Sequence, residues 1–468
     1  MTNPNDIRVT TNQTAWAAGL RASIVGLARE GVDLAKYLTA HGADVLVTDA
    51  KPASGLTAQI EELAGTPVRY SLGGHPIDEV LAADIVYVSP GVPPTIPLLE
   101  EARARRVPIS SGIALFFERC SSPIIAITGS SGKTTTTALV GSMLQASGRH
   151  TWVGGNIGVP LYSRLPEIAP DHIVVLELSS FQLQPLKVSP WVGAITNITP
   201  NHLDRHASME EYAEAKANIV RFQRPGDWAV LNADDDGSRS VRAPAGLLEF
   251  SLERPVEGAF LAGDSLRLRR HGSDVEICRT ANVTLRGRHN LANILTACAI
   301  VSVAGVENST MASVATEFRG VAHRLELIRV VNGVSYVNDS IATSPERSMA
   351  ALASYTEPLV LLAGGKDKHL PMEEWGQQIA SRVRELVLFG EAAPLIERAA
   401  TAAGMPRARI HRVERVPEAV ATAQHLSHAG DVVLLSPGGT SYDQYQDYVE
   451  RGLDFAAAVG SLTTEQSA

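Results

Sequence analysis

Short apolar runs alternate with helical patterns from about residue 20 onward. The runs at 22–25, 45–48 and 85–89 are rich in β-branched residues, and each is followed within two residues by Gly or Asp. A helical pattern at 31–40 separates the first two runs. Strand-like runs that alternate with helices predict a parallel sheet with helices on its faces. We therefore expect an α/β, Rossmann-like unit at the start of the chain.

The same order of elements recurs in the middle and in the last third of the chain. Apolar runs at 124–127, 173–178 and 192–198 predict a central parallel sheet, and a helical pattern after the first run extends to about residue 145. Between 240 and 285 apolar and polar positions alternate, which predicts an antiparallel appendage. A second Rossmann-like unit is predicted from strand-like runs at 334–337, 359–362, 386–389 and 432–435.

The length and composition of the chain agree with three folded domains. Its 468 residues are about three times a usual domain, and we place the boundaries near 120 and 323, giving 1–120, 121–323 and 324–468. A hydrophobic content of 45% and a mean hydropathy of +0.03 exclude wholesale disorder. The 41 Lys and Arg against 50 Asp and Glu leave a charge of −9, which argues against a broad nucleic-acid-binding face.

The cysteines and the hydropathy profile give a prediction of location. Cys120, Cys278 and Cys298 are odd in number and far apart, a pattern typical neither of a disulfide framework nor of a zinc site. No apolar run approaches the roughly 18 residues that span a bilayer. We expect a cytoplasmic protein in a reducing compartment, without a membrane span, and we expect it to be a monomer.

The strongest local signal for chemistry is the segment 128–135, which reads Thr-Gly-Ser-Ser-Gly-Lys-Thr-Thr. A glycine loop between a strand and a helix holds phosphate through backbone N–H groups, while Lys133 supplies charge and Thr134 can ligate Mg2+. The usual pattern has a glycine where this chain has Ile127. A tight turn without a nucleotide is the alternative. The predicted phosphate-binding residues are Gly129, Ser130, Ser131, Gly132, Lys133, Thr134 and Thr135.

A second glycine loop follows the first strand, at 26–31. Asp49 ends the next strand about 20 residues later, at the position where a ribose hydroxyl is often held. The loop lacks the full three-glycine fingerprint of dinucleotide sites. Taken alone, a plain strand-to-helix turn and nucleotide binding are equally compatible with it.

Three further residues are each compatible with two roles. Glu177 ends a predicted buried strand, so it suits either a Mg2+ site or a structural ion pair. His202 precedes a helix predicted from 208 to 222, where it can be functional or simply hydrogen-bonded. Lys216 lies on that helix, where a lone lysine is ordinarily a solvated surface residue.

Considered together, these segments resemble the ordered motif set of the Mur ligases. The resemblance covers nearly the whole chain and is strongest to the branch that adds glutamate. It implies an ATP-dependent amide ligase of peptidoglycan synthesis: the carboxylate of UDP-N-acetylmuramoyl-L-alanine is phosphorylated, and the amine of glutamate attacks the acyl phosphate. The matching segments are 128–135, 155–158, 177–183, 197–205 with Lys216, 287–290, 323–324, 338–340 and 435–445.

The resemblance also implies a role for each candidate site residue. It implies ATP and two Mg2+ ions, with catalytic roles for Lys133, Glu177, His202 and a carbamylated Lys216, and it implies that Thr134, Glu177, His202 and the carbamate hold metal. The implied UDP-substrate residues are Gly26, Leu27, Ala28, Arg29, Asp49, Asn156, Ser180 and Gln182. Asn290, Arg324 and Asp339 would complete the ATP site, and Thr343, Lys368, Ser441 and Tyr448 would hold glutamate.

Two positions depart from the family pattern. Ile341 stands where a lysine usually follows Asn-Asp-Ser, and Tyr448 stands where Phe is common. We expect D-glutamate as the acceptor, and L-glutamate, which a related branch uses, is the alternative. A folylpolyglutamate-type ligase is disfavoured by the complete unit before the phosphate loop. A P-loop ATPase switch is the remaining alternative, and the short polar end at 463–468 does not resemble a partner-binding helix.

Overall fold

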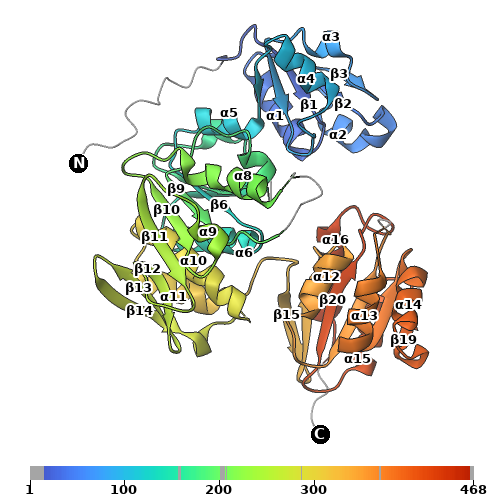
Figure 1. Cartoon of the computed structure of the whole chain (residues 1–468). Coiled ribbons are helices and arrows are strands. Elements are labelled where there is room, and N and C mark those ends of the chain that lie inside the picture. Colours follow the sequence, from blue (N-terminus) through green and yellow to red (C-terminus); the bar gives the residue numbers. More distant parts are fainter. Residues whose placement is uncertain are drawn as a thin grey trace. The chain divides into compact units, whose positions relative to one another are not determined.

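The structure, a computed structural model, describes residues 15–156, 160–200, 206, 208–285, 287–367 and 370–463 (Figure 1). The chain forms two compact units. The first comprises Met1–Val283 with Arg288–Glu317, and the second comprises Thr284–Gly287 with Phe318–Ala468. The first unit contains a five-stranded and a nine-stranded sheet, and the second contains a six-stranded sheet.

The five-stranded sheet is fully parallel, with the strand order β3-β2-β1-β4-β5. This confirms the Rossmann-like prediction for the start of the chain. Its strands are β1 (Arg21–Val25), β2 (Asp44–Asp49), β3 (Val68–Leu72), β4 (Ile85–Val88) and β5 (Ile109–Ser110). Its helices are α1 (Arg29–Ala40), α2 (Thr57–Glu62), α3 (Ile77–Val80), α4 (Pro97–Ala104) and α5 (Gly112–Arg119).

The nine-stranded sheet has the order β14-β13-β12-β11-β10-β9-β6-β8-β7. Its strands are β6 (Ile124–Thr128), β7 (Thr151–Gly155), β8 (Ile173–Glu177), β9 (Val192–Ile195), β10 (Trp228–Asn232), β11 (Gly246–Ser251), β12 (Gly258–Ala262), β13 (Ser265–Arg270) and β14 (Ser273–Arg279). The helices that accompany it are α6 (Lys133–Ala146), α7 (Ser180–Leu183), α8 (Met209–Arg221), α9 (Asp236–Arg239), α10 (Arg288–Val303) and α11 (Asn308–Glu317).

The segment predicted as an antiparallel appendage continues this central sheet. β12, β13 and β14 pair in the antiparallel sense, as predicted. β11, which the same prediction included, instead pairs in parallel with both β10 and β12. The connection explains the direction of β11 relative to β10, because β10 leads into α9 and a crossover, whereas β12 and β13 are joined by a tight turn. The sheet is therefore mixed.

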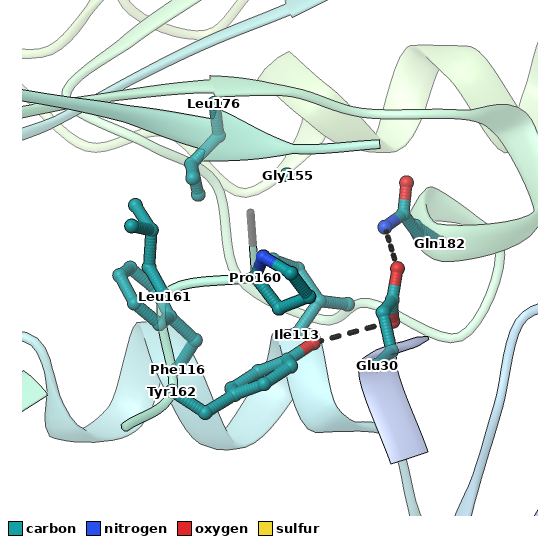
Figure 2. A pocket seen from close by; sticks show the side chains of 9 residues that line it. All are labelled: Glu30, Ile113, Phe116, Gly155, Pro160, Leu161, Tyr162, Leu176 and Gln182. Atoms are coloured by element: carbon teal, nitrogen blue, oxygen red, sulfur yellow. Dashed lines mark hydrogen bonds between the residues drawn. The ribbon is translucent and has the colours of Figure 1, made fainter. Parts of the chain in front are cut away.

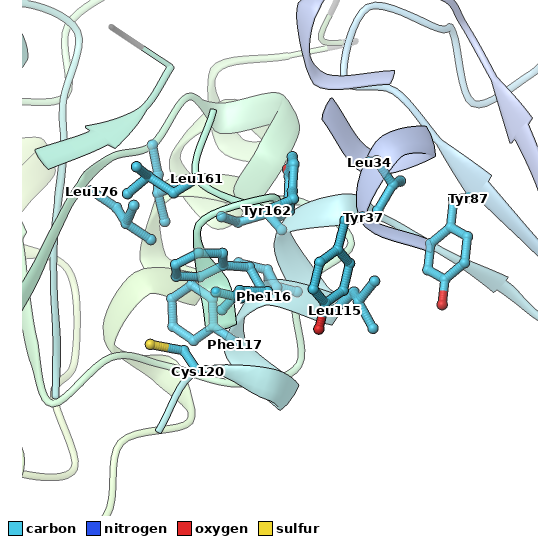
Figure 3. Close-up of a cluster of buried hydrophobic side chains, with 14 of the residues drawn as sticks. Leu34, Tyr37, Tyr87, Leu115, Phe116, Phe117, Cys120, Leu161, Tyr162 and Leu176 are labelled. Carbon is cyan, nitrogen blue, oxygen red and sulfur yellow. The ribbon is translucent and has the colours of Figure 1, made fainter. Parts of the chain in front are cut away.

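One hydrophobic core joins the two sheets of the first unit (Figure 3). Leu34 and Tyr37 of α1 belong to it, as do Phe116 of α5 and Leu176 of β8. Each fully buried side chain of this size stabilises the fold by about 1.5–3 kcal/mol. The boundary predicted near residue 120 directly follows α5, and the segments on its two sides share this core.

The six-stranded sheet of the second unit has the order β15-β16-β20-β17-β18-β19, and only β15 is antiparallel to its neighbour. Apolar clusters cover both of its faces, which explains the continuous apolar runs of its strands. The strands are β15 (Glu326–Val331), β16 (Val334–Asn338), β17 (Leu359–Gly364), β18 (Val383–Phe389), β19 (Ile410–Arg412) and β20 (Val432–Gly438). The helices are α12 (Pro345–Leu352), α13 (Glu373–Arg382), α14 (Ala393–Ala402), α15 (Val416–Leu426) and α16 (Tyr448–Gly460).

The three cysteines are buried and free. Among the described residues, no helix combines the length and the apolar character that a membrane crossing requires.

Candidate functional site

The loop between β6 and α6 has a backbone that requires glycine at two positions. Gly129 has a φ of 154° and Gly132 a φ of 81°. A Cβ atom at Gly129 would lie 1.9 Å from Thr196 Oγ1, and one at Gly132 would lie 2.4 Å from Asn293 Oδ1. The two glycines therefore permit the turn that exposes the N-terminus of α6 at the carboxyl edge of the sheet. Backbone N–H groups in such a turn can bind phosphate.

Two lysine side chains converge on one backbone oxygen of this loop. The Nζ atoms of Lys133 and Lys216 donate hydrogen bonds to the carbonyl oxygen of Gly129 at 2.8 and 2.9 Å. Lys133 begins α6, whereas Lys216 comes from α8. Lys216 is only 1% exposed, so the surface position suggested by its sequence context alone is wrong. The fold thus concentrates two amines at the end of β6.

The surroundings of the Lys216 amine favour its neutral form. Burial, and after it the charge of Lys133, lower the pKa of this amine to about 6, against the opposing effect of Glu177. The amine also lies 4.6 Å from the centre of the Tyr212 ring. Near pH 7 much of this lysine is therefore uncharged, and a neutral amine is a nucleophile.

Glu177 ends β8 and is buried beside the phosphate loop. Its Oε2 accepts a hydrogen bond from Thr134 Oγ1 at 2.8 Å, and its Oε1 accepts one from Asn156 Nδ2 at 2.9 Å. β8 pairs directly with β6, which brings the two strand ends together as the sequence predicts. A hydroxyl and a carboxylate oxygen side by side are the hard ligands that Mg2+ prefers, so Thr134 and Glu177 fit a metal site.

Tyr212 belongs to this site, although it was not among the residues predicted from the sequence. Its hydroxyl lies 3.1 Å from Ser130 Oγ in the loop, and its ring meets His206 edge-on at 5.3 Å. Tyr212 and Lys216 are four residues apart on α8, so they share one face of the helix. That spacing is a sequence signal for a shared face, but only the fold shows that this face meets Ser130.

Ser180 and Asn290 are linked to the loop between β6 and α6 through other residues. Ser180 begins α7 immediately after the Glu177 strand, and its Oγ lies 2.9 Å from His206 Nε2. Asn290 stands in the first turn of α10 and accepts a hydrogen bond from Asn293 Nδ2 at 3.0 Å. Because Asn293 borders Gly132, Asn290 is one helical turn from the residue that contacts the loop.

The loop between β1 and α1 is held in place by Asp49. Asp49 Oδ2 accepts a hydrogen bond from the backbone N–H of Leu27 at 2.7 Å. On the other side Ser89 Oγ donates to the carbonyl oxygen of Gly26 at 3.0 Å. Residues 26–29 thus lie at the carboxyl edge of the five-stranded sheet, where parallel sheets bind nucleotides. Asp49 braces this loop, and its contact with a ribose stays a prediction.

Gln182 connects the two sheets of the first unit. Its Oε1 accepts a hydrogen bond from the backbone N–H of Ser179 at 2.9 Å, and its Nε2 donates to Glu30 Oε1 at 2.6 Å (Figure 2). Glu30 lies in the first turn of α1, directly after the 26–29 loop. Gln182 is only 2% exposed, and both ends of its amide are bonded. A substrate that reaches Gln182 therefore meets an amide of fixed orientation.

In the second unit Asp339 is buried at the carboxyl end of β16. Its Oδ2 accepts from Ser436 Oγ at 2.8 Å, and its Oδ1 accepts from the backbone N–H of Leu325 at 3.3 Å. Burial raises the pKa of Asp339 to about 7, although both hydrogen bonds and the charges of Arg324 and Arg347 oppose the rise. This carboxyl group is poised to change its charge when a cation or a ligand approaches.

Arg451 is a fully buried cation at the same edge of this sheet. Its Nε and Nη2 donate to Ser340 Oγ at 3.0 Å and to the Ser340 carbonyl oxygen at 2.8 Å, while Nη1 donates to the Gly439 carbonyl oxygen at 3.1 Å. Burial lowers the pKa of Arg451 to about 10. The side chain joins the loop after β16 to the loop after β20. The sequence analysis missed it, because an arginine in a helical pattern ordinarily faces solvent.

Ser441, Tyr448 and Thr343, three of the residues predicted to bind glutamate, lie in or next to the loops that follow β16 and β20. Ser441 is buried shortly after β20, and the carbonyl oxygen of Tyr448 accepts from Ser340 Oγ at 2.8 Å. The backbone N–H of Thr343 donates to the carbonyl oxygen of Ile341 at 2.8 Å. Ile341 thus contributes a backbone link at the position where the motif usually carries a lysine.

The site residues fall into two sets. Those around the two glycine loops belong to the first unit, whereas Arg324, Asp339, Thr343, Ser441 and Tyr448 belong to the second. Two further predicted residues, His202 and Lys368, lie outside the described residues. The convergence of the two sets around one ligand stays a prediction.

Comparison with protein families gives matches along most of the chain. Residues 21–111 match the model of the Mur ligase MurD-like N-terminal domain. Residues 127–301 match the Mur ligase middle domain, and residues 323–439 match the Mur ligase glutamate ligase domain.

Comparison with curated proteins gives relatives of similar length. The chain is 42% identical over 448 residues to the UDP-N-acetylmuramoylalanine–D-glutamate ligase of Symbiobacterium thermophilum, covering 95% of this chain and 98% of the relative. It is 41% identical to the ligase of the same name from Roseiflexus sp., covering 95% of this chain and 99% of the relative. For the one from Acetivibrio thermocellus the identity is 40%, with 94% and 96% covered.

Solved structures share the fold at low identity. The UDP-N-acetylmuramate–alanine ligase MurC from Thermotoga maritima aligns with a TM-score of 0.59 at 20% identity, over 94% of this chain and 99% of that one. MurF from Acinetobacter baumannii aligns with a TM-score of 0.55 at 17% identity, over 91% and 87% of the two chains.

Replacing Asp339 by Asn is expected to change how the stability of the second unit depends on pH. The pKa of about 7 in the folded unit exceeds the ordinary value of 3.8, so between these values the folded unit holds the proton more tightly than the unfolded chain does. The resulting stabilisation is complete below about pH 4 and is lost as the pH rises through about 7, by at most about 1.4 kcal/mol per pH unit. Asp339→Asn removes this loss.

The measurement is hydrogen exchange of peptides from β16 and β20 between pH 5 and pH 8, corrected for the intrinsic exchange rate. Protection in the wild type should fall with rising pH more steeply than in Asp339→Asn. The control is Glu373→Gln, which removes an exposed acid of the same unit and should keep the wild-type slope. Equal slopes in Asp339→Asn and the wild type would contradict the account.

Proposed function

The chain belongs to the Mur ligase family, and on this premise we propose that it joins D-glutamate to UDP-N-acetylmuramoyl-L-alanine in peptidoglycan synthesis. The reaction consumes ATP and releases ADP and phosphate. The observation that carries the proposal is the identity of about 40%, over nearly the full length of both chains, to ligases named for this reaction. The two lysines and the carboxylate at the ends of β6 and β8 supply groups that this chemistry needs.

The carboxylate of the alanine is a poor electrophile and needs activation. One of its oxygens attacks the γ-phosphorus of ATP, and the bond from that phosphorus to the bridging oxygen of ADP breaks, which leaves an acyl phosphate. The loop N–H groups hold the phosphates, and Lys133 offsets the negative charge that accumulates during transfer. The amine of glutamate then attacks the carbonyl carbon, and phosphate leaves with the oxygen that came from the substrate.

The donor set at the loop fits Mg2+. Thr134 and Glu177 place a hydroxyl and a carboxylate oxygen 2.8 Å apart beside the phosphate loop. With His202 and a modified Lys216 they are our candidate ligands for two ions. When bound, Mg2+ would neutralise charge on the transferred phosphoryl group.

We assign Lys216 a carbamate on the basis of its burial and its pKa. The neutral amine attacks the carbon of CO2 and loses one proton, which gives an anionic group with two oxygens. The low pKa of about 6 makes the neutral amine available near pH 7. The contacts with Gly129 and Thr128 place the nitrogen at the end of β6, next to the phosphate loop.

The other loops are assigned to the two remaining substrates. The 26–29 loop and Asp49 bind the UDP moiety, with Asn156, Ser180 and Gln182 toward the muramoyl-alanine. Asn290, Arg324 and Asp339 complete the ATP site. Thr343, Lys368, Ser441 and the backbone near Tyr448 bind glutamate.

One prediction of the proposed function concerns the acceptor. With ATP, Mg2+ and UDP-N-acetylmuramoyl-L-alanine, release of phosphate and formation of the amide product should depend on added D-glutamate. L-Glutamate is the matched control. It is also the second candidate for the acceptor, because Ile341 stands where the family usually has a lysine. Product with L-glutamate alone would reassign the stereochemistry. Phosphate release that needs neither enantiomer would contradict a ligase and favour an ATPase switch.

Another prediction of the proposed function concerns Lys216. Lys216→Ala should reduce kcat by at least about a hundredfold, because it removes the carbamate that helps to hold Mg2+. A short carboxylate such as acetate or formate can enter the vacated space, so millimolar amounts should restore part of the activity. The measurement is the rate of amide formation as a function of added carboxylate.

The control for this experiment is Lys187→Ala, which removes an exposed lysine of the same unit. It should keep wild-type activity with and without added carboxylate. Wild-type activity in Lys216→Ala would refute the carbamate assignment. An inactive Lys216→Ala variant that no short carboxylate rescues would also count against it.

A further inference from the structure

Glu30 carries an acidic group into the contact between the two sheets of the first unit. It stands in the first turn of α1, directly after the 26–29 loop, and its carboxylate lies between Tyr162 and Gln182 (Figure 2). Oε1 accepts from Gln182 Nε2 at 2.6 Å, and Oε2 accepts from the Tyr162 hydroxyl at 3.3 Å. Glu30 and Tyr162 both line two small neighbouring pockets at this contact.

The bond to Glu30 completes the orientation of the Gln182 amide. Gln182 Oε1 accepts from both the backbone N–H and the Oγ of Ser179, at 2.9 and 3.0 Å. Ser179 Oγ in turn accepts from the backbone N–H of Gln182, so the pair forms a capping box for α7. With its oxygen committed to Ser179, the amide can present only its Nε2 toward α1. Removing the Glu30 carboxylate leaves this buried donor without its acceptor.

A separate acid on the same helix fastens the neighbouring loop. Asp33 Oδ2 accepts from the backbone N–H groups of Tyr162 and Ser163 at 2.8 and 3.3 Å. Asp33 lies one turn after Glu30, and its bonds go to the backbone of the 160–163 loop. The two acids of α1 thus bind different groups: Asp33 accepts from the backbone of the 160–163 loop, whereas Glu30 accepts from the side chains of Tyr162 and Gln182.

The buried carboxyl group of Glu30 favours a specific role over a merely structural contact between α1 and α7. Burial raises the pKa of the Glu30 carboxyl, against the hydrogen bonds of Tyr162 and Gln182 and the charge of Arg29. A buried acid is an expensive way to hold two layers together, since apolar residues of similar volume often stabilise as well or better. A carboxylate beside a loop proposed to bind a diphosphate would also repel the ligand. Here the Glu30 carboxylate instead faces the donors of Tyr162 and Gln182.

We propose that Glu30 is a positioning residue that couples the UDP loop to the muramoyl-alanine side of the site by fixing the Gln182 amide. This inference rests on the proposed function. The residue needs no contact with the substrate: it acts through Gln182 and through the capping box that orients Ser179 and Ser180. Its effect should therefore fall on recognition of the muramoyl-alanine moiety and spare the UDP moiety.

The test compares two binding constants in the full chain. Isothermal titration calorimetry gives the Kd of UDP and the Kd of UDP-N-acetylmuramoyl-L-alanine. The first divided by the second is the gain in affinity that the muramoyl-alanine moiety provides. In Glu30→Ala this ratio should fall about tenfold, because a buried donor loses its charged acceptor, while the Kd of UDP stays unchanged. Glu30→Gln should keep the ratio within about threefold, since its amide oxygen can accept from Gln182 and its N–H2 can donate to Tyr162.

Asp33→Ala is the matched control, on the same helix and at the same contact. It should leave the ratio unchanged even if the unit becomes less stable. An unchanged ratio in Glu30→Ala, or an equal loss for both ligands, would overturn the proposal. If Glu30→Ala does not fold, Glu30→Asp, which withdraws the carboxylate by one methylene, provides the same comparison. A wild type that binds neither ligand would instead refute the proposed function.

Discussion

The structure of the site depends on one carbonyl oxygen. The amines of Lys133 and Lys216 both donate to the oxygen of Gly129, and Glu177 stands beside them at the end of the neighbouring strand. Burial and the charge of Lys133 lower the pKa of the Lys216 amine, and its neutral form reduces the repulsion between the two lysines. The loop geometry that exposes this oxygen requires glycine at 129 and at 132. The register of β6 against β8 and β9 therefore sets the distances on which the proposed chemistry depends.

The contact between the two sheets of the first unit holds further predicted site residues in place. A common hydrophobic core holds α1 and α5 against the central sheet, and the acids of α1 add polar contacts at the same surface. The 26–29 loop and the segment after Glu177 are thereby held within one unit. In the second unit, the buried Arg451 and Asp339 organise the loops after β16 and β20 in a similar way. Each unit thus holds its own set of predicted site residues in a fixed arrangement.

Much of this could be predicted from the sequence. Continuous apolar runs located the parallel strands, because strands buried on both faces carry little polar alternation. The segment 128–135 predicted the turn between β6 and α6, because that turn requires glycine at 129 and 132. Lys216 was harder: its place on a helix indicates a surface residue, and only the family resemblance argued otherwise. Tyr212, Arg451 and Glu30 were missed, because their roles come from contacts between segments that are far apart in sequence. β11 was placed in an antiparallel region, because alternation alone does not distinguish the direction of a strand.

In the proposed function, the charges around Gly129 serve to activate the alanine carboxylate with ATP. The most direct measurement labels both oxygens of that carboxylate in UDP-N-acetylmuramoyl-L-alanine with 18O and follows the label during turnover with glutamate. If the carboxylate attacks the γ-phosphorus, one labelled oxygen per turnover must appear in the released phosphate. The amide product must retain the other. Phosphate that carries no label, released at the rate of amide formation, would contradict the account.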